Sequence, residues 1–287
     1  MEADSNNTEV TRPYRGRFAP TPSGPLHFGS LVAAVGSYLE ARQNAGDWLV
    51  RMEDLDTPRV IPGAADAILR TLEAFGFEWQ GAVMWQSRRT EAYRDAFTRL
   101  ERKGHVYPCG CSRAVQEGSG CAAKCSGGIV PGTVIRSWRT RVPPEAICWN
   151  DWLHGEQCTS PARDFVVLRG DGIFAYQLAV VVDDAAQEIS EVVRGADLLG
   201  TTACQICLQR WLNFRQLTYF HLPIARTDEG EKLSKQTHAP AIDQNGDARQ
   251  LRDALRFLGQ LIPLDLQSIP EIWEWAFQEW RPELIPH

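Results

Sequence analysis

Hydrophobic and polar positions along this chain predict strands and helices in alternation. Tyr14 to Ala19 predicts a strand that ends at two prolines, and Leu31 to Arg42 has the spacing of a helix with an apolar face. Trp48 to Met52 predicts a second strand, and Ala64 to Phe75 predicts a second helix. Because strands that alternate with crossover helices form parallel sheets, this part of the chain predicts an α/β fold.

The pattern changes after a further helix predicted over Glu91 to Lys103. Residues 105–160 are rich in Cys, Gly and Pro, which suggests an insertion, and they include a short strand expected over Val134 to Arg139. The α/β alternation then returns. We expect strands over Phe165–Leu168, Ile189–Val193 and Tyr219–Ala225, a buried apolar run over Ala175–Val182, and helices over Thr202–Leu212, 249–259 and 270–280.

These elements predict four parts. We expect a flexible tail over residues 1–13, a Rossmann-like parallel-sheet domain over 14–104 and 189–245, an inserted α+β subdomain over 105–188, and a short helical extension over 246–287. A chain of 287 residues is long enough to bury a stable core without cross-links.

Composition narrows the class of protein. Hydrophobic residues make up 44% and charged residues 23%, which excludes a disordered chain, a collagen and a long coiled coil. No run of 18 apolar residues is present, so we expect no membrane partner. The polar start, Met1 to Val10, is not expected to be a secretion signal, and we expect a cytoplasmic protein.

The net charge of −6 means that any RNA partner must be held by a local basic patch. Residues 88–113 are a candidate, because they hold seven basic against three acidic side chains. A solvated helix face laced with ion pairs explains the same residues equally well.

Two loops carry residues suited to phosphate chemistry. The first, Arg17 to Ser30, lies between the first strand and first helix, where an open parallel sheet binds ligands. Its glycines let a phosphate approach the backbone, and His27 can donate a hydrogen bond to a phosphate oxygen. The second loop holds Lys232 and Lys235, which can neutralise a polyphosphate. A Pro- and Gly-rich loop with an incidental histidine, and an ordinary lysine-rich loop, are the alternatives.

Together the two loops resemble a known family. Pro22 to Gly29 resembles the HIGH motif of class I aminoacyl-tRNA synthetases, and Lys232 to Lys235 resembles their KMSKS loop. Three further segments are similar to glutamyl-tRNA synthetases: Arg51 to Arg59, Tyr176 to Asp184, and Val193 to Leu199. The resemblance implies a class I synthetase type of sheet.

The resemblance, which runs from Tyr14 to Asp243, has two departures. Ser30 stands where the HIGH motif ends in His, and the sequence ends soon after the KMSKS-like loop, so we expect no anticodon-binding domain. This combination is similar to the glutamyl-queuosine tRNA(Asp) synthetases, a truncated family. The resemblance implies tRNA-independent activation of L-glutamate with ATP and Mg²⁺, then transfer to queuosine in the anticodon of tRNA(Asp). The partners that it implies are L-glutamate, ATP and tRNA(Asp) bearing queuosine. We expect the protein to be a monomer.

The resemblance also implies site residues. For glutamate they are Arg17, Phe18, Ala19, Pro20, Thr21, Ser23, Glu53, Tyr176 and Arg194, and for ATP they are His27, Gly29, Ser30, Lys232, Ser234 and Lys235. His27 and Lys235 are expected to be catalytic, by stabilising charge on the phosphates. Glu53 is expected to receive the α-ammonium and Arg194 the side-chain carboxylate, since a guanidinium matches a carboxylate.

Alternatives remain at this stage. Glu53 and Arg194 suit an ordinary surface ion pair, because their separation in sequence carries no information. The chain also suits a truncated synthetase that charges the 3′ end of tRNA-Glu or a small carrier, a plain nucleotidyltransferase, or a non-catalytic zinc-bearing RNA-binding protein. Ser30 keeps the last alternative open, because a hydroxyl cannot carry positive charge.

The cysteines are a separate signal. Cys109, Cys111, Cys121 and Cys125 fall within seventeen positions, and four thiolates suit one structural, tetrahedral Zn²⁺. Four reduced cysteines in a loop are the alternative, but a Gly-rich segment needs a cross-link to hold its shape. The resemblance adds that related enzymes carry a zinc in this insertion.

The remaining cysteines and the C-terminal tryptophans are expected to pack. Cys204 and Cys207 have a redox-like spacing but lie in a predicted helix among apolar residues. Trp273, Trp275 and Trp280 are expected in the core, because their acidic surroundings repel phosphates. Cys148 and Cys158 receive no role.

Overall fold

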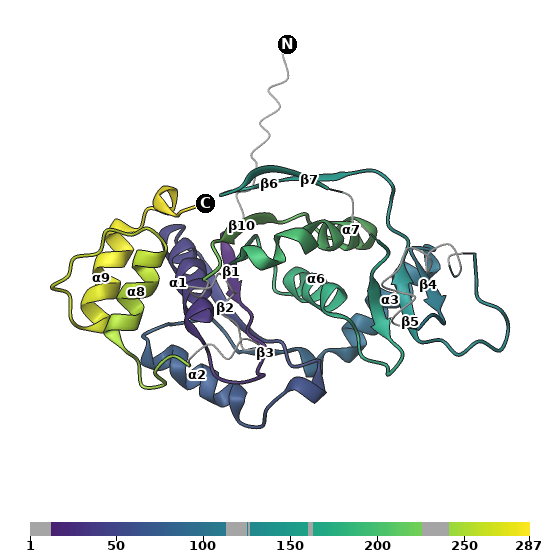
Figure 1. The fold of residues 1–287 in the computed structure, drawn as a ribbon, viewed down its shortest axis with the longest axis horizontal. Helices are drawn as coiled ribbons and strands as arrows, with labels where there is room; N and C mark the ends of the chain where they lie inside the picture. The colour runs from purple at the N-terminus through teal and green to yellow at the C-terminus, as the bar shows by residue number, and fades with distance from the viewer. Residues whose placement is uncertain (1–12, 113–124, 126, 160–162, 226–240) are drawn as a thin grey trace, which may run out of the picture.

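A mostly parallel sheet in two parts, of three and four strands, runs through the middle of the molecule (Figure 1). The computed structural model describes residues 13–112, 125, 127–159, 163–225 and 241–287. The strands of this sheet are β1 (Arg15–Phe18), β2 (Asp47–Met52), β3 (Met84–Trp85), β9 (Glu191–Gly195), β10 (Thr218–Leu222), β6 (Ile147–Asp151) and β7 (Gly155–Thr159). The first three pair as β1-β2-β3, and the other four pair as β7-β6-β10-β9, with only β7 antiparallel.

The two halves of the sheet meet between β1 and β9. The Ser190 amide donates a hydrogen bond to the Arg15 carbonyl at 2.9 Å, and β1 lies against β9. The chain therefore proceeds outward from this junction in both directions, to β2 and β3 on one side and to β10 on the other. In a doubly wound sheet such a reversal leaves a crevice at the carboxyl ends of the strands, where ligands bind.

Helices cover the sheet on both faces. They are α1 (Phe28–Gln43), α2 (Ala64–Ala74), α3 (Thr90–Arg102), α6 (Tyr176–Ala186), α7 (Thr202–Leu212), α8 (Ala248–Phe257) and α9 (Ile269–Glu279), with short 3₁₀ turns at Thr57–Arg59, Gln86–Arg88, Ala196–Thr201 and Pro282–Leu284. One core joins α1, α8 and α9 to one face of the sheet, and another joins α7 to the opposite face of β6, β9 and β10. A further core joins α3, α6 and α7.

The C-terminal helices α8 and α9 pack on α1, as Figure 1 shows. The Trp273 indole donates to the Phe75 carbonyl, and the Trp280 indole donates to Glu40, each at 2.7 Å. Trp275 packs against the same core. The prediction that these tryptophans belong to the core is confirmed. A buried indole places its N–H on a partner, and here both partners, Phe75 and Glu40, belong to the N-terminal part of the chain.

A small antiparallel sheet lies at the opposite end of the molecule from α9 (Figure 1). Its strands are β4 (Val106–Cys109), β5 (Ser137–Thr140) and β8 (Val166–Arg169). We call this sheet, together with Cys109, Cys111 and Cys125, the cysteine module. The strand predicted over Val134 to Arg139 is therefore shifted toward its C-terminal end.

Two parts of the predicted insertion belong to the central body instead. The hairpin of β6 and β7 extends the main sheet, because β6 pairs with β10, and α6 packs between α3 and α7. Burial alternates along β6, with Ile147 and Trp149 facing the core and Cys148 facing solvent. A strand that is half-buried only when β10 lies beside it cannot be assigned to a sheet from its own sequence.

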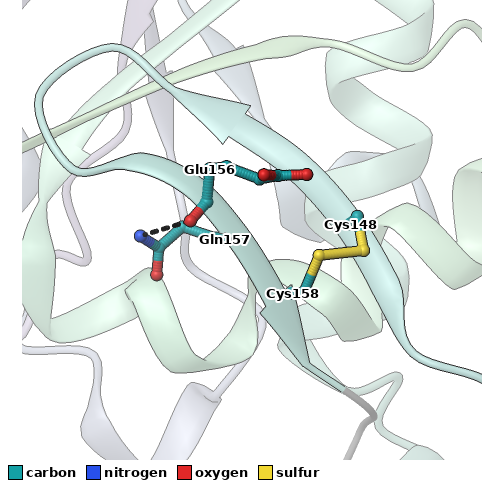
Figure 2. The surroundings of a disulfide bond; sticks show 4 residues. All are labelled: Cys148, Glu156, Gln157 and Cys158. Carbon is teal, nitrogen blue, oxygen red and sulfur yellow. Dashed lines mark hydrogen bonds between the residues drawn. A yellow bond between two sulfur atoms is a disulfide. The ribbon is translucent and has the colours of Figure 1, made fainter.

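A disulfide joins the two strands of this hairpin. Figure 2 shows the bond between Cys148 and Cys158, which are both exposed and stand directly opposite one another in the register. The Gln157 amide donates to the neighbouring Glu156 carbonyl at 3.3 Å (Figure 2). These two cysteines had no predicted role, and their pairing follows from the register of the strands.

Most predicted elements are confirmed, with ends shifted by a few residues. The apolar run at Ala175–Val182 is helix α6, and its first turn begins at Tyr176. Cys207 is buried in a core cluster, and burial raises the pKa values of Cys204 and Cys207 to about 11 and about 12. The packing role is confirmed for Cys207, and raised pKa values disfavour the thiolates that redox chemistry needs. Among the described residues, no helix has the length and apolar content to span a bilayer.

Candidate active site

The loop between β1 and α1 brings His27 to the helix N-terminus. The Ser30 amide donates to His27 Nδ1 at 3.2 Å, so the neutral ring carries its proton on Nε2. The His27 backbone also forms a β-bridge with Ala241, and the Ile242 amide donates to the Leu26 carbonyl at 3.0 Å. The chain that follows the second predicted phosphate loop therefore returns beside the first. Lys232, Ser234 and Lys235 themselves lie outside the described residues.

The same loop is tied to the end of β2. The Glu53 amide donates to the Pro20 carbonyl at 3.0 Å, which fixes Ala19 to Ser23 beside Glu53. Phe18 departs from the prediction. Its side chain is buried in the core under α1 and stacks on Trp48, with ring centroids 6.2 Å apart. Because successive side chains in a strand point to opposite faces, Phe18 points away from Arg17 and offers the site only its backbone.

A buried charge cluster lies beneath this loop. Asp184, from α6, accepts from Arg17 Nε at 3.2 Å and pairs with Arg51 Nη1 at 2.8 Å. Burial alone would raise the pKa of Asp184, but the two guanidinium groups hold it below its usual range. Arg17 also donates to the Val193 carbonyl at 3.4 Å. The guanidinium of Arg17 is therefore held by the protein itself, and it links three elements of the sheet crevice.

Glu53 stands at the edge of this cluster with an unused acceptor. Its side chain is 10% exposed, and Oε1 lies 3.6 Å from Arg51 Nη2 but accepts no hydrogen bond within the described part of the chain. Burial raises the pKa of Glu53 to about 7, although Arg51 and Arg17 lower it. A carboxylate in this position gains most from a cationic ligand, which would restore a charge-assisted hydrogen bond.

Arg194, on β9, is buried among neutral partners. Its guanidinium donates to His221 Nε2 at 3.0 Å, to Gln205 Oε1 at 2.8 Å and to Thr202 Oγ1 at 2.9 Å. Its side chain also lies over the Tyr219 ring, 5.6 Å from the centroid. Among the described residues, no carboxylate lies within ion-pair distance of Arg194. The surface ion pair that the sequence left open for Glu53 and Arg194 is therefore wrong.

Tyr176 links the two ends of the site. It opens α6, and burial raises the pKa of its hydroxyl. The charge of Glu53 raises this pKa further, whereas Arg194 and Arg17 lower it. The hydroxyl of Tyr176 is therefore close enough to Glu53, Arg17 and Arg194 for the charge of each to shift its pKa.

Three cysteines converge in the cysteine module. The sulfur atoms of Cys109, Cys111 and Cys125 all lie within 4.8 Å of one another. Burial raises the pKa of Cys125, and the sulfurs of Cys111 and Cys125 are 3.5 Å apart. Three soft donors at this spacing fit a thiophilic cation such as Zn²⁺. Cys121, the fourth predicted ligand, lies outside the described residues.

The basic segment around α3 is partly used for packing. Arg89 pairs with Asp183 at 2.6 Å, Lys103 donates to the Trp211 carbonyl at 2.7 Å, and Arg99 donates to the Leu212 carbonyl. The last two cap the C-terminal end of α7, where a cation is favourable. These three residues have structural partners, whereas Arg94 faces solvent.

Comparison with known proteins identifies the family. Residues 14–117 and 134–262 match the model of the class I tRNA synthetases (E and Q), catalytic domain. The glutamyl-Q tRNA(Asp) synthetase of Dechloromonas aromatica (strain RCB) is 53% identical over 96% of this chain and 97% of its own length. This chain belongs to the glutamyl-Q tRNA(Asp) synthetase family.

Other members of the family match as completely. The proteins of that name from Geobacter sulfurreducens and Neisseria meningitidis serogroup C are 50% and 45% identical, over 96% and 95% of this chain and 94% and 97% of their own lengths. The fold is similar to that of glutamate-tRNA synthetase from Elizabethkingia anophelis, with a TM-score of 0.77 and 23% identity, over 96% of this chain and 67% of that chain. The class I synthetase fold is thus confirmed.

Sequence reasoning missed the residues that contact the buried arginines Arg17 and Arg194. Asp184 and Arg51 lay within segments that were recognised by resemblance, but neither was singled out as a charge partner. His221, Gln205 and Thr202 carried no signal, because a polar residue inside a predicted strand or helix has no distinctive spacing. Only the fold shows that all three surround Arg194.

Proposed function

We propose that this chain activates L-glutamate with MgATP without tRNA, and then transfers the glutamyl group to queuosine in the anticodon of tRNA(Asp). The names of its close relatives and the matching family model support the assignment to this reaction. The surroundings of Arg194 and Glu53 support glutamate as the amino acid.

The observation that carries the proposal is the buried, unpaired charge of Arg194. A buried cation is costly unless an anion compensates it, and the partners of Arg194 are neutral. Three of its five N–H donors are used, one on each nitrogen, so each terminal nitrogen has one more to offer. A side-chain carboxylate of glutamate supplies the missing charge, whereas the amide of glutamine does not.

The other end of the amino acid fits Glu53. The α-ammonium group would donate to Glu53 Oε1, which accepts no hydrogen bond among the described residues. The α-carboxylate is then free to attack the α-phosphorus of ATP. A bond forms between a carboxylate oxygen and phosphorus, and the bond to pyrophosphate breaks, with charge stabilised by His27 and Lys235.

The second step transfers the glutamyl group. A hydroxyl of the queuosine cyclopentene diol would attack the carbonyl carbon of the adenylate. An ester bond forms, the bond to phosphate breaks, and AMP leaves. The protein supplies position and charge for this step, and no covalent intermediate with the chain is required.

ATP–pyrophosphate exchange driven by glutamate without tRNA tests the first step. Glutamine and aspartate are the matched amino-acid controls, since one lacks the charge and the other is one methylene shorter. Charging of queuosine-containing and unmodified tRNA(Asp), with tRNA-Glu as a further acceptor, tests the second step. If none of the amino acids supports exchange, the proposal is contradicted and a non-catalytic RNA-binding role is favoured.

We further propose that Cys109, Cys111, Cys121 and Cys125 hold one structural Zn²⁺. Four protein ligands leave no open coordination position, so the metal would fix the shape of the module and take no part in the reaction. Metal analysis of the purified protein tests this directly. Cys111→Ser is expected to lose the metal, while Cys204→Ser, at a cysteine outside the module, is expected to retain it.

The remaining proposals concern the assembly and the compartment. We propose that the chain acts as a monomer. We also propose the domain limits given above, except that β6, β7 and α6 belong with the main sheet and its helices. Light scattering of the purified protein tests the monomer. Because the proposed substrate is a tRNA, we propose that the protein works in the cytoplasm.

A further inference from the structure

A line of buried hydrogen bonds runs from β6 to the guanidinium of Arg194. Asp151 Oδ2 lies 2.5 Å from His221 Nδ1, and Arg194 Nε donates to His221 Nε2 at 3.0 Å. Asp151, His221 and Arg194 are 1%, 0% and 6% exposed. Three strands that are neighbours in the sheet, β6, β10 and β9, each contribute one of these side chains.

The direction of each hydrogen bond follows from the chemistry of arginine. A guanidinium has donors and no acceptor, so His221 Nε2 must offer its lone pair to Arg194. The ring proton of neutral His221 is therefore on Nδ1, and it is donated to Asp151. Burial lowers the pKa of His221, and Arg194 lowers it further, although the hydrogen bond to Asp151 raises it. His221 thus links Asp151 to Arg194 as a neutral ring.

The hairpin turn fixes Asp151. Its Oδ1 accepts from the amides of Leu153 and His154, at 3.3 and 3.1 Å. The His154 ring in turn makes a hydrogen bond to the His221 carbonyl, with Nε2 3.1 Å from that oxygen. The hairpin therefore holds both the side chain and the backbone of His221.

We propose that Asp151 and His221 are positioning residues for Arg194, so that its guanidinium is held in one orientation for the side-chain carboxylate of the amino acid. This inference rests on the proposed function. A carboxylate placed directly on Arg194 would cancel the charge that the substrate needs. The neutral ring supplies a fixed acceptor and keeps the negative charge of Asp151 one residue away.

Asp151→Asn tests the orientation of the ring. The asparagine oxygen can still accept from the two turn amides, but its NH₂ group then faces His221 Nδ1. The ring must switch its proton to Nε2, which then opposes the N–H of Arg194. We expect the KM for glutamate to rise about tenfold, and the preference for glutamate over glutamine to fall, while the KM for ATP stays within about twofold.

Variants at His221 provide the rescue. His221→Gln keeps an acceptor for Arg194 and a donor for Asp151, so we expect a KM within about threefold of the wild type. His221→Leu removes both and is expected to behave like Asp151→Asn or worse. Asp164→Asn is the matched control, because Asp164 also accepts from a backbone amide and a side chain, at Val142 and Tyr107, but lies by the cysteine module.

The outcomes separate this inference from the proposed function. Absence of glutamate-dependent exchange in the wild type overturns both. Glutamate-driven exchange with an unchanged KM in Asp151→Asn and His221→Leu overturns the positioning role alone, as does an equal rise of both KM values. Nitrogen NMR of the wild-type imidazole gives a readout that needs no variant, since a neutral ring protonated on Nδ1 is expected, and a charged ring or one protonated on Nε2 contradicts the proposal.

Discussion

Buried arginines in two regions of this molecule differ in whether their partners are charged or neutral. Arg17 and Arg51, on β1 and β2, share Asp184, and Glu53 lies beside them. Arg194, on β9, has only neutral partners among the described residues. In the first region the fold supplies the counter-charge, and in the second region the described residues supply none, which is where we propose that the side-chain carboxylate of glutamate binds.

This difference separates structural from functional charge. A buried ion pair that the chain completes by itself holds elements together, and removing one partner leaves an uncompensated charge. A buried cation that is hydrogen-bonded but not neutralised has a fixed orientation and can form a strong, charge-assisted hydrogen bond with an anion from outside. The two regions should therefore respond differently when their partners are changed.

Removal of the internal counter-charge is expected to have the largest effect. Asp184→Asn leaves Arg17 and Arg51 buried without their carboxylate, and we expect a loss of about 3–5 kcal/mol in the free energy of unfolding. Asp47→Asn is the matched control, because Asp47 is 41% exposed and pairs with Arg15 at the surface. Its loss is expected to cost below about 1 kcal/mol. Denaturant unfolding measures both, and equal losses would contradict the distinction.

Truncation of Arg194 is expected to reduce activity more than stability. Arg194→Ala removes the partner of the substrate carboxylate, so kcat/KM for glutamate in ATP–pyrophosphate exchange should fall about a hundredfold. Arg169→Ala, at a 41% exposed arginine paired with Asp56 and Asp171, serves as the control. Glutamate activation that survives Arg194→Ala would mean that another cation binds the carboxylate.

An internal carboxylate beside Arg194 should give this arginine a counter-charge from the fold, as Arg17 and Arg51 already have. Gln205→Glu places an acid 2.8 Å from the guanidinium, where the glutamine oxygen now lies. We expect the KM for glutamate to rise about tenfold, because the new side chain competes with the substrate. Gln205→Met, which adds no charge, should raise the KM less. If the Gln205→Glu variant keeps the KM of the wild type, the substrate carboxylate does not bind at Arg194.

The pH dependence of glutamate binding is the smallest expected effect. The pKa of Glu53 is raised to about 7, and the α-ammonium group needs its ionised form. The KM for glutamate should therefore fall by several-fold as the pH rises from about 6 to about 8. The free energy of unfolding should also fall as the pH rises, since burial favours protonated Glu53; this contribution is present in full below the usual pKa of 4.5 and is lost as the pH rises through about 7. If the KM for glutamate of the Glu53→Gln variant still changes with pH near 7, the titrating group is not Glu53.

The sequence determined the α/β class and the family, and it predicted the two phosphate loops. Periodicity gave most helices and strands, because a surface helix or a half-buried strand shows its apolar face in its own spacing. Arg17, Glu53 and Arg194 were found by resemblance within short segments. Spacing within a segment also brought together Cys109, Cys111 and Cys125.

Only the tertiary structure decided which charges meet. The pairing of Asp184 with Arg17 spans 167 positions, and the contact of Asp151 with His221 spans 70. Such contacts depend on the order of strands in the sheet, and strand order is not written in the periodicity of any one strand. The same reason explains Phe18, whose side chain turned to the core, and the hairpin of β6 and β7, whose buried face exists only beside β10.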